Sequence, residues 1–445
     1  MPPSVRPARG MRDFLPPDVR RREYVIAIVE ETYRRYGFQP LETPALENIE
    51  TLTGKYGEEG NKLIFKVLRR GEHESSGETD LALRYDLTVP LARVVAEHRG
   101  KLPRFFKRYQ IQPVWRADRP ARGRFREFYQ CDVDAIGSRS MMVETELCSA
   151  VADVLQRLGF RDFVIRINHR RLLAGLLDAA GVASDLHGQA LVALDKMDKI
   201  GAGGVLRELQ ERGITADGQR VLAAFAAGTT LQSIREFVGD RQEAQGAIAE
   251  LEQIFNLASA TSARTHLRFD VTLARGLSYY TGAIMEINVP DLAGSLGGGG
   301  RYDGLIGMFC GENIPACGFS LGLERILVVM GERGMFPAGV DAGGADVLVT
   351  QFEGEDPAES LRLAGELRQA GLRVEVYPEP DKLGKQFKYA SAAAIARVAV
   401  LGADERARGV VTIKDMRSGQ QQPIPRAELP ALRQAVLREA SEVEP

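Results

Sequence analysis

The chain has 445 residues, of which 44% are hydrophobic and 27% charged, with a formal net charge of −2. This length predicts two or three compact units, and the near-neutral charge excludes a protein that binds nucleic acid through a wholly basic surface, although a local basic face remains open. No apolar run approaches the length that crosses a bilayer and no secretory signal opens the chain, so we expect a cytoplasmic protein without a membrane segment.

Helical periodicity marks the first predicted element, over residues 19–36, where apolar residues recur at helical spacing before Gly37. The extended segment FQPLETPALE follows, and residues 81–137 mix strand-like runs with turn residues. A second amphipathic helix is predicted over 141–158. From about 170 to 260 the chain is rich in Ala, Leu, Gln and Glu at helical spacing, which predicts a helical insertion.

Strand patterns return at GAIMEINV and continue through GSLGGGGRYDG to the strand-to-helix passage GFSLGLERIL. After a flexible connector the last hundred residues alternate strand and helix, which predicts a separate α/β domain with a substantially parallel sheet. We therefore expect a first domain over 1–335, interrupted by the insertion at about 170–260, and an α/β domain over 344–445.

The segment VWRADRPARGRFREFYQCDVD is typical of a long hairpin, because two extended runs flank a loop that holds Pro120 and Gly123. Closure near Asp118 and Arg124 would set Arg116 opposite Arg126, and opposed like charges are destabilising unless an anion lies between them. We therefore expect a polyphosphate site; the alternative is a solvated face of a surface hairpin. Strand alternation predicts one shared face, and Phe125 turned away from it. That face would carry Arg124, Arg126, Phe128, Gln130, Asp132 and Asp134.

Three further segments carry residues suited to a ligand site. In TLARGLSYYTG, Arg275, Tyr279 and Tyr280 lie beside turn glycines, which favours a loop that reaches a ligand, although the tyrosines could also split between core and surface. The GGGG run before RYDG allows close backbone approach or forms a flexible turn. Arg325 of GFSLGLERIL falls in the first helical turns, where it would project into the same cleft or lie on the helix surface.

Two kinds of nucleotide or metal site are not supported by the sequence. There is no GxxxxGK[ST] loop, and KMDKIG resembles the nucleotide loop of class I synthetases without the partner motif of that class. The four cysteines lack CxxC spacing and no histidine pair has metal-site spacing, so we expect free thiols in a reducing compartment and no residue that ligates a metal.

Taken together, these segments resemble the class II aminoacyl-tRNA synthetases, and within them the histidyl-tRNA synthetases. YGFQPLETPALE is similar to motif 1 of that class, the hairpin segment to motif 2 and GFSLGLERIL to motif 3. LARGLSYYTG and GGGGRYDGL resemble the histidine-specific signatures, and RGMRDFLP resembles the opening segment of the family. Ser278 stands where that signature usually carries an aspartate, so the hydrogen bonds of that aspartate are in question here.

The resemblance implies an α/β protein with an antiparallel-sheet catalytic domain, a helical insertion and a C-terminal α/β anticodon-binding domain. It also implies a homodimer that uses ATP and Mg²⁺ to activate L-histidine and transfers it to tRNA(His). One alternative is a regulatory paralogue of histidine biosynthesis, which binds histidine without aminoacylation and typically lacks the C-terminal domain. A nucleic-acid-binding module without enzymatic activity would leave the opposed arginines and the tyrosines without a common purpose.

For ATP, the resemblance implies that Arg116 and Arg325 bind the phosphates, that Phe128 stacks on adenine, and that Asp118 and Arg124 help to hold the nucleotide. Arg116, Arg325 and Arg275 would be the catalytic cations.

For histidine, the resemblance implies a set that surrounds each end of the amino acid. Asp86, Thr88 and Gln130 would bind the α-amino group, Arg275 would lie near the carboxylate, and Tyr302 would close the pocket. The residues that frame the imidazole would be Asp134, Tyr279 and Tyr280.

Overall fold

The computed structural model describes residues 4–69, 71, 76–214, 218–220, 230–274, 278–337, 339–341 and 344–429. The chain divides into two compact units, the first made of residues 1–13 and 22–335 and the second of residues 14–21 and 336–445. Within the described ranges, no helix is long and apolar enough to cross a bilayer.

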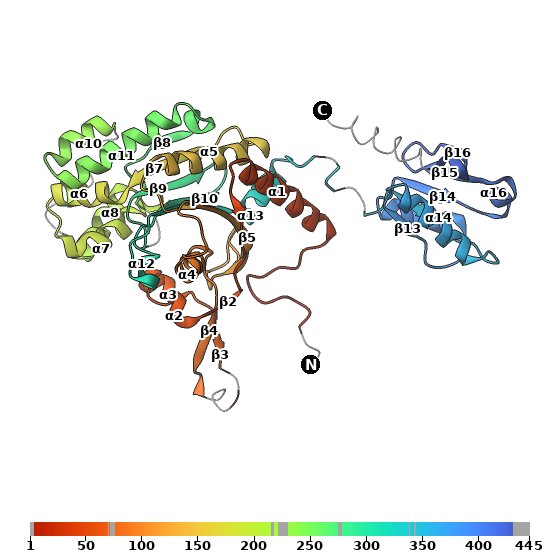
Figure 1. Cartoon of the computed structure of the whole chain (residues 1–445), viewed down its shortest axis with the longest axis horizontal. Coiled ribbons are helices and arrows are strands. Elements are labelled where there is room, and N and C mark those ends of the chain that lie inside the picture. Colours follow the sequence, from red (N-terminus) through yellow and green to blue (C-terminus); the bar gives the residue numbers. More distant parts are fainter. Residues whose placement is uncertain are drawn as a thin grey trace. The chain divides into compact units, whose positions relative to one another are not determined.

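An eight-stranded sheet forms the centre of the first unit (Figure 1), in the order β1-β5-β6-β11-β10-β9-β7-β8. Its strands pair antiparallel except at the two edges, where β1 lies parallel to β5 and β8 parallel to β7. The predicted antiparallel-sheet domain is confirmed. The strands are β1 (Gln39–Pro40), β5 (Phe106–Trp115), β6 (Glu127–Ile136), β7 (Val164–His169), β8 (Leu267–Phe269), β9 (Ala283–Asn288), β10 (Gly297–Arg301) and β11 (Ala316–Gly322).

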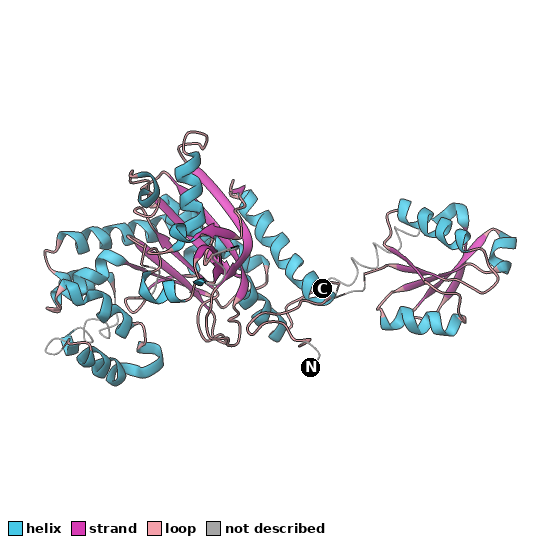
Figure 2. Ribbon diagram, turned by 90° about the horizontal axis from the view of Figure 1, so that it is seen from below, coloured by secondary structure: helices cyan, strands magenta, loops and turns pink. Residues whose placement is uncertain are grey.

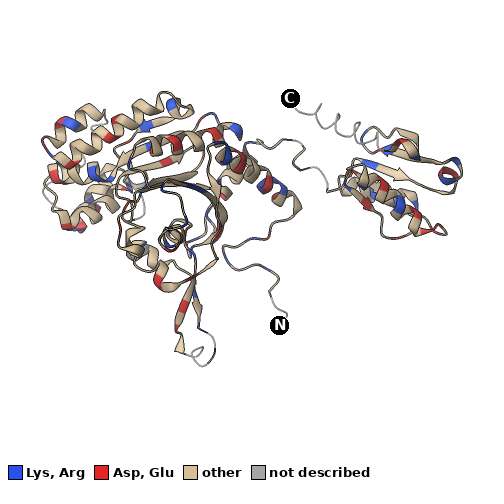
Figure 3. Cartoon of the chain, viewed as in Figure 1, with Lys and Arg blue, Asp and Glu red and all other residues tan. Residues whose placement is uncertain are grey.

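Two helices confirm the first helical predictions. α1 (Pro16–Arg35) buries Val25, Val29 and Tyr33 at three- and four-residue spacing, and Figure 3 shows acidic and basic residues interspersed along the rest of it. α5 (Met142–Arg157) buries most of its length. A third helix, α13 (Leu323–Glu332), follows β11 directly and begins beside the sheet.

A helix also lies within a segment for which strand-like runs and turns were expected. α4 (Thr88–His98) lies within the 81–137 segment and buries Val89, Leu91 and Val95. Its β-branched residues made the segment look strand-like, but Pro90 falls in the first helical turn, where its missing N–H is tolerated. The Asp86 carboxylate accepts the Val89 N–H at 3.0 Å and helps to start the helix. The prediction of strands here was wrong.

Smaller elements surround α4 on the same side of the unit. β2 (Leu46–Asn48), β4 (Thr79–Leu83) and β3 (Lys66–Leu68) form a three-stranded sheet in that order. The short helices α2 (Ile49–Leu52), α3 (Gly57–Lys62) and α12 (Gly307–Cys310) complete the group, and Figure 1 shows β3 and β4 projecting away from it.

The helical insertion is confirmed. His169, the last residue of β7, ties the insertion to the sheet, because its ring accepts the Arg171 N–H at 3.1 Å through Nδ1 and contacts Glu250 at 2.9 Å through Nε2. KMDKIG lies in this region, at the start of α8. The helices of the insertion are α6 (Arg170–Ala179), α7 (His187–Leu194), α8 (Met197–Glu211), α10 (Leu231–Val238) and α11 (Gln242–Ala258).

The second unit is an α/β domain whose five-stranded sheet has the order β13-β12-β14-β15-β16. The first three strands are parallel, but β15 and β16 pair antiparallel, so the expectation of a substantially parallel sheet holds only for part of it. Helices cover both faces (Figure 2). The elements are β12 (Val347–Val349), α14 (Pro357–Gln369), β13 (Val374–Val376), α15 (Leu383–Ala392), β14 (Arg397–Val400), α16 (Ala403–Arg408), β15 (Val410–Asp415) and β16 (Gln421–Pro425).

Candidate active site

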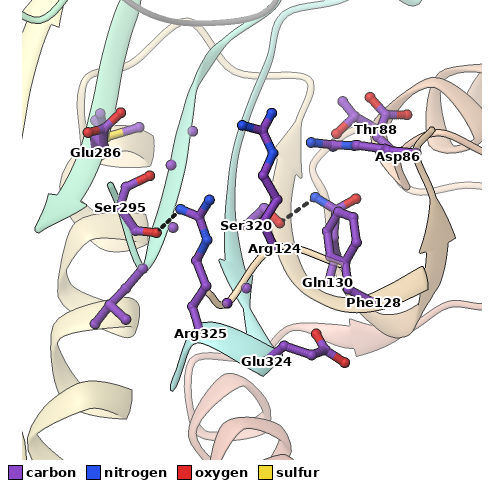
Figure 4. A pocket seen from close by; sticks show the side chains of 18 of the residues that line it. Asp86, Thr88, Arg124, Phe128, Gln130, Glu286, Ser295, Ser320, Glu324 and Arg325 are labelled. Atoms are coloured by element: carbon purple, nitrogen blue, oxygen red, sulfur yellow. Dashed lines mark hydrogen bonds between the residues drawn. The ribbon is translucent and has the colours of Figure 1, made fainter. Parts of the chain in front are cut away.

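A cavity of about 370 Å³ opens over the middle of the large sheet, and Figure 4 shows the side chains that point into it. Ten of the thirteen residues expected from the sequence line this cavity, so segments far apart in the chain meet at one place. They are Asp86, Thr88, Arg116, Asp118, Arg124, Phe128, Gln130, Tyr279, Tyr280 and Arg325.

The other three residues have different positions. Asp134 and Tyr302 do not line the cavity but are buried beneath it, with 2% and 1% of their surface exposed. Tyr302 therefore does not close the pocket in this structure. Arg275 lies outside the described residues.

Three arginines reach the cavity from different elements. Arg116 lies over the rings of Tyr85 and Phe128, at 4.4 and 5.2 Å from their centroids, and its Nε donates to the Tyr85 carbonyl at 3.0 Å. Arg124 donates to Asp118 Oδ1 at 3.0 Å.

Arg325, on the first turn of α13, donates to the Ser295 carbonyl (Figure 4). Because Arg325 lines the cavity, the helix-surface alternative is excluded, and the described part of the cavity wall carries three arginines.

The predicted hairpin is present, and its register sets Trp115 opposite Glu127. At the next pair of residues toward the hairpin loop, the Arg116 N–H donates to the Arg126 carbonyl at 2.9 Å, as expected for opposed residues. Their side chains diverge, however, because Arg126 turns away and donates to the Asp118 carbonyl at 3.1 Å. The expected repulsion between these two side chains is therefore wrong as a reason for an anion, and the cationic side chains among the described residues of the cavity are those of Arg116, Arg124 and Arg325.

Strand alternation also fails in the hairpin loop. Phe125, expected to turn away, lines the cavity, whereas Arg126 does not line it. Regular alternation begins only where β6 begins, so from Phe128 and Gln130 onward the predicted face is correct.

The glycine run forms a strand under the cavity rather than a flexible turn, so the turn alternative was wrong. A Cβ at Gly299 would lie 2.1 Å from the Gly318 carbonyl oxygen, and one at Gly297 would lie 2.4 Å from the Ser320 carbonyl oxygen. Only glycine fits between the neighbouring strands here, and the bare backbone of β10 leaves space above the sheet for a ligand.

Also on the cavity wall, the buried carboxylate of Asp86 accepts three hydrogen bonds. Tyr56 and the Val89 N–H donate to Oδ1 and Tyr279 donates to Oδ2, each at 3.0 Å. Burial raises the pKa of Asp86, while the Val89 amide, the Arg116 guanidinium and the two tyrosine hydroxyls lower it. These donors and Arg116 favour the ionised carboxylate at the edge of the pocket.

Gln130 supplies an acceptor next to this carboxylate. Its amide nitrogen donates to the Ser320 hydroxyl at 2.8 Å (Figure 4), which fixes the side chain in one orientation. Among the described residues, its Oε1 has no hydrogen-bond partner. A buried, unpaired amide oxygen that lines a cavity is suited to a donor group on a ligand.

Beneath the cavity, two carboxylates share one fully buried arginine. Arg108 Nη2 lies 2.8 Å from Asp134 Oδ2 and 3.9 Å from Asp132 Oδ2, and Tyr302 donates to Asp134 Oδ1 at 2.5 Å. Burial raises the pKa of Asp132 to about 7, although Arg108 opposes the change. A Cβ at Gly318 would lie 1.8 Å from Asp134 Oδ1, so glycine is required for the carboxylate to sit there.

Sequence reasoning missed several residues of the site. Tyr56 belongs to none of the motifs, and Glu286 and Glu324 line the cavity. Glu324 accepts the Tyr129 N–H at 2.9 Å, and burial raises its pKa to about 7. The only sequence feature that could have indicated Glu324 was its position beside Arg325 in the motif 3 segment. Among the described residues, no three acidic, cysteine or histidine side chains gather as a metal cage.

Comparisons with known proteins cover both units. A family model described as histidyl-tRNA synthetase matches residues 10–326, and one described as an anticodon binding domain matches residues 346–435. The chain is 43% identical to a histidine–tRNA ligase of Porphyromonas gingivalis, over 95% of this chain and 97% of that protein. It is 44% identical to a histidine–tRNA ligase of Gloeobacter violaceus, over 94% of this chain and 96% of that protein.

Solved structures agree with this. A crystal structure of histidyl-tRNA synthetase from a Nostoc species matches with a TM-score of 0.81 at 30% identity, covering 98% of this chain and 100% of that chain. A Bacillus halodurans structure described as an ATP phosphoribosyltransferase regulatory subunit/histidyl-tRNA synthetase matches with a TM-score of 0.72 at 23% identity, which shows a shared fold alone. From the family match and the identities, the chain belongs to the histidyl-tRNA synthetase family.

Proposed function

We propose that the cavity holds ATP and L-histidine side by side and joins them into histidyl-adenylate, before the histidyl group passes to tRNA(His). The chain is a histidine–tRNA ligase and uses ATP; what is proposed is which residues do this work. The observation that carries the proposal is the meeting of three arginines, a stacking aromatic ring and a buried carboxylate in one cavity.

ATP occupies the cationic end. The Phe128 ring stacks on adenine, and Arg116 and Arg325 bind the phosphates, because guanidinium groups pair well with phosphate oxygens. Arg124, held by Asp118 at 3.0 Å, supports the nucleotide from the hairpin loop. The absence of a Gly-rich phosphate loop from the sequence is consistent with phosphates that are held by side chains.

Histidine occupies the acidic end. Its α-ammonium group meets the Asp86 carboxylate, the Gln130 amide oxygen and the Thr88 hydroxyl. Tyr279 and Tyr280 frame the imidazole, with Asp134 and Tyr302 below them. Arg275, by resemblance, lies near the carboxylate of histidine and the α-phosphate.

The reaction needs positioning and charge neutralisation more than a base. The carboxylate of histidine is ionised at neutral pH and attacks the α-phosphorus itself, while pyrophosphate leaves. Cations that face the reacting phosphate stabilise the charge of the transition state in a partly dehydrated cavity. Arg116 fits this role, because two aromatic rings and the Tyr85 carbonyl hold its planar group in place.

Mg²⁺ fits this cavity as a companion of ATP. Magnesium in nucleotide sites is held by one or two carboxylates together with substrate phosphates, and does not need a cage of protein ligands. Of the four described carboxylates in the cavity wall, Asp86 and Asp118 already have other partners, and Glu286 and Glu324 would hold the ion. When bound, the ion neutralises phosphate charge.

The rest of the assignment follows from the family. We propose that residues 1–335 act as the catalytic domain, residues 344–445 bind the anticodon, and the active form is a cytoplasmic homodimer. The match of an anticodon binding domain over 346–435 favours a ligase over a regulatory paralogue that binds histidine without aminoacylation.

Two substitutions on one strand should separate the two ends of the cavity. Phe128→Ala should raise the KM for ATP about tenfold, because base stacking on an aromatic ring is lost, and leave the KM for histidine near that of the parent. Gln130→Ala should raise the KM for histidine about tenfold through loss of a charged hydrogen bond, with little change for ATP. Pyrophosphate exchange, titrated in each substrate, measures both values.

The control for this pair is Tyr129→Ala, because Tyr129 lies between the two residues on the other face of β6 and stacks on Arg22. It should change neither KM. If Phe128→Ala and Gln130→Ala both change the same KM, the division of the cavity into two ends is wrong.

A further inference from the structure

Tyr56, which lies outside the recognised motifs, contacts Asp86, one of the residues that line the cavity. It precedes α3, only 5% of its surface is exposed, and its ring lies 4.6 Å from the ring of Tyr85. Its hydroxyl donates to Asp86 Oδ1 at 3.0 Å. In a buried, low-dielectric environment such a hydrogen bond is stronger than in water, so it holds the carboxylate firmly in one orientation.

The donors to Asp86 divide its two oxygens unequally. Tyr56 and the Val89 N–H both bind Oδ1, whereas only Tyr279 binds Oδ2. A carboxylate oxygen accepts about two hydrogen bonds. Oδ1 is therefore filled by the protein, and Oδ2 keeps capacity for a donor in the cavity.

A second contact joins the chain beside Tyr56 to the chain beside Tyr279. The Ser278 hydroxyl donates to the Lys55 carbonyl at 3.2 Å. An ionised aspartate at position 278 has no proton to donate, so this link depends on the serine that replaces the usual aspartate of the resembling signature. Lys55 and Ser278 directly precede Tyr56 and Tyr279, so this hydrogen bond links the two segments that carry the tyrosines bound to Asp86.

We propose that Tyr56 is a positioning residue for amino-acid recognition, whose hydroxyl fixes the Asp86 carboxylate so that Oδ2 meets the α-ammonium group of histidine. This rests on the proposed role of Asp86. The residue does not itself touch the substrate; it acts through the orientation and the charge of Asp86.

The charges around Asp86 give this role a pH signature. Arg116 and the hydroxyls of Tyr56 and Tyr279 stabilise the ionised form, and burial opposes it. Loss of the Tyr56 donor raises the pKa of Asp86, so the ionised carboxylate that an ammonium group needs is lost at a higher pH. The other groups that face Asp86 are Tyr85, Tyr280, Asp132 and Asp134.

The test is Tyr56→Phe, which removes the hydroxyl and keeps the ring. The KM for histidine should rise roughly tenfold, as for loss of a hydrogen bond to a charged group, while kcat and the KM for ATP stay within about twofold. The acid limb of kcat/KM for histidine should move to higher pH. Tyr33→Phe is the matched control, because Tyr33 is a buried tyrosine that donates to the Cys131 carbonyl at 3.4 Å, and it should change neither value.

Asp86→Asn and the double variant separate this inference from the proposed function. If Tyr56 acts through Asp86, adding Tyr56→Phe to Asp86→Asn changes the KM for histidine little further. A parent-like Asp86→Asn would overturn the assignment of Asp86 itself. An impaired Asp86→Asn beside a parent-like Tyr56→Phe, or effects that multiply in the double variant, would overturn the role of Tyr56 alone.

Discussion

Arg116→Ala should reduce the kcat of histidine-dependent pyrophosphate exchange at least about a hundredfold, because it removes a fixed cation aimed at the charge of the transition state. The side chain is held by three contacts: the rings of Tyr85 and Phe128 and the carbonyl of Tyr85. Arg116→Lys should recover only part of the rate, since an ammonium group keeps the charge but not the planar stacking.

The hairpin provides the matched control for this prediction. Arg126 lies opposite Arg116 in the ladder, carries the same charge, and turns away to the Asp118 carbonyl. Arg126→Ala should therefore retain most of the kcat. Equal losses in both variants, or a loss at Arg116 confined to the KM with an unchanged kcat, would mean that Arg116 does not act on the reacting phosphate.

Asp134→Ala should lower kcat/KM for histidine about ten- to a hundredfold, as expected when a hydrogen bond to a charged group is lost. Asp132→Ala should have a smaller effect. Both carboxylates lie near Arg108, but Asp134 is closer to the guanidinium and also accepts a hydrogen bond from the Tyr302 hydroxyl. These contacts stabilise the ionised form of Asp134 more than that of Asp132. Burial raises the pKa of Asp132 to about 7, which makes it a weaker anion at neutral pH.

Gly318→Ala should reproduce the Asp134 defect although both aspartates are retained. Its Cβ would lie 1.8 Å from Asp134 Oδ1, a separation that the carboxylate can relieve only by leaving its place. Gly331→Ala is the control and should keep full activity, because apart from the backbone of its own helix and its chain neighbours nothing lies within 4 Å of the added carbon. A histidine titration of pyrophosphate exchange decides between the variants; a crippled Asp132→Ala beside a parent-like Asp134→Ala would reassign the imidazole carboxylate to Asp132.

The parts of the site that could be predicted from the sequence are those with regular local geometry. The pairing of Arg116 with Arg126 follows from closure of the hairpin near Asp118 and Arg124, and the shared face of Phe128 and Gln130 follows from strand periodicity. Where the backbone is irregular, periodicity gives no guide. Phe125 and Arg126 therefore exchanged their expected sides in the loop before β6 begins.

Other residues were missed because their positions depend on packing between distant segments. Tyr56, which precedes α3, reaches Asp86 only when it packs into the core cluster that holds the buried residues of α4, and no local pattern marks that contact. α4 itself was hidden by β-branched residues, whose strand preference is overridden when they pack inside a core. The glycine run looked like a turn because the need for bare backbone becomes visible only when β9 and β11 flank it.

The central claim is that one cavity selects histidine and activates it with ATP. The most direct test is ATP–pyrophosphate exchange with each of the twenty amino acids in turn, in the presence of magnesium. Histidine alone should drive exchange, because the acidic end of the cavity pairs its α-amino group and frames its imidazole, and an unpaired buried polar group penalises every substitute. Exchange driven by proline, threonine or glycine instead of histidine, or by no amino acid at all, would contradict the account.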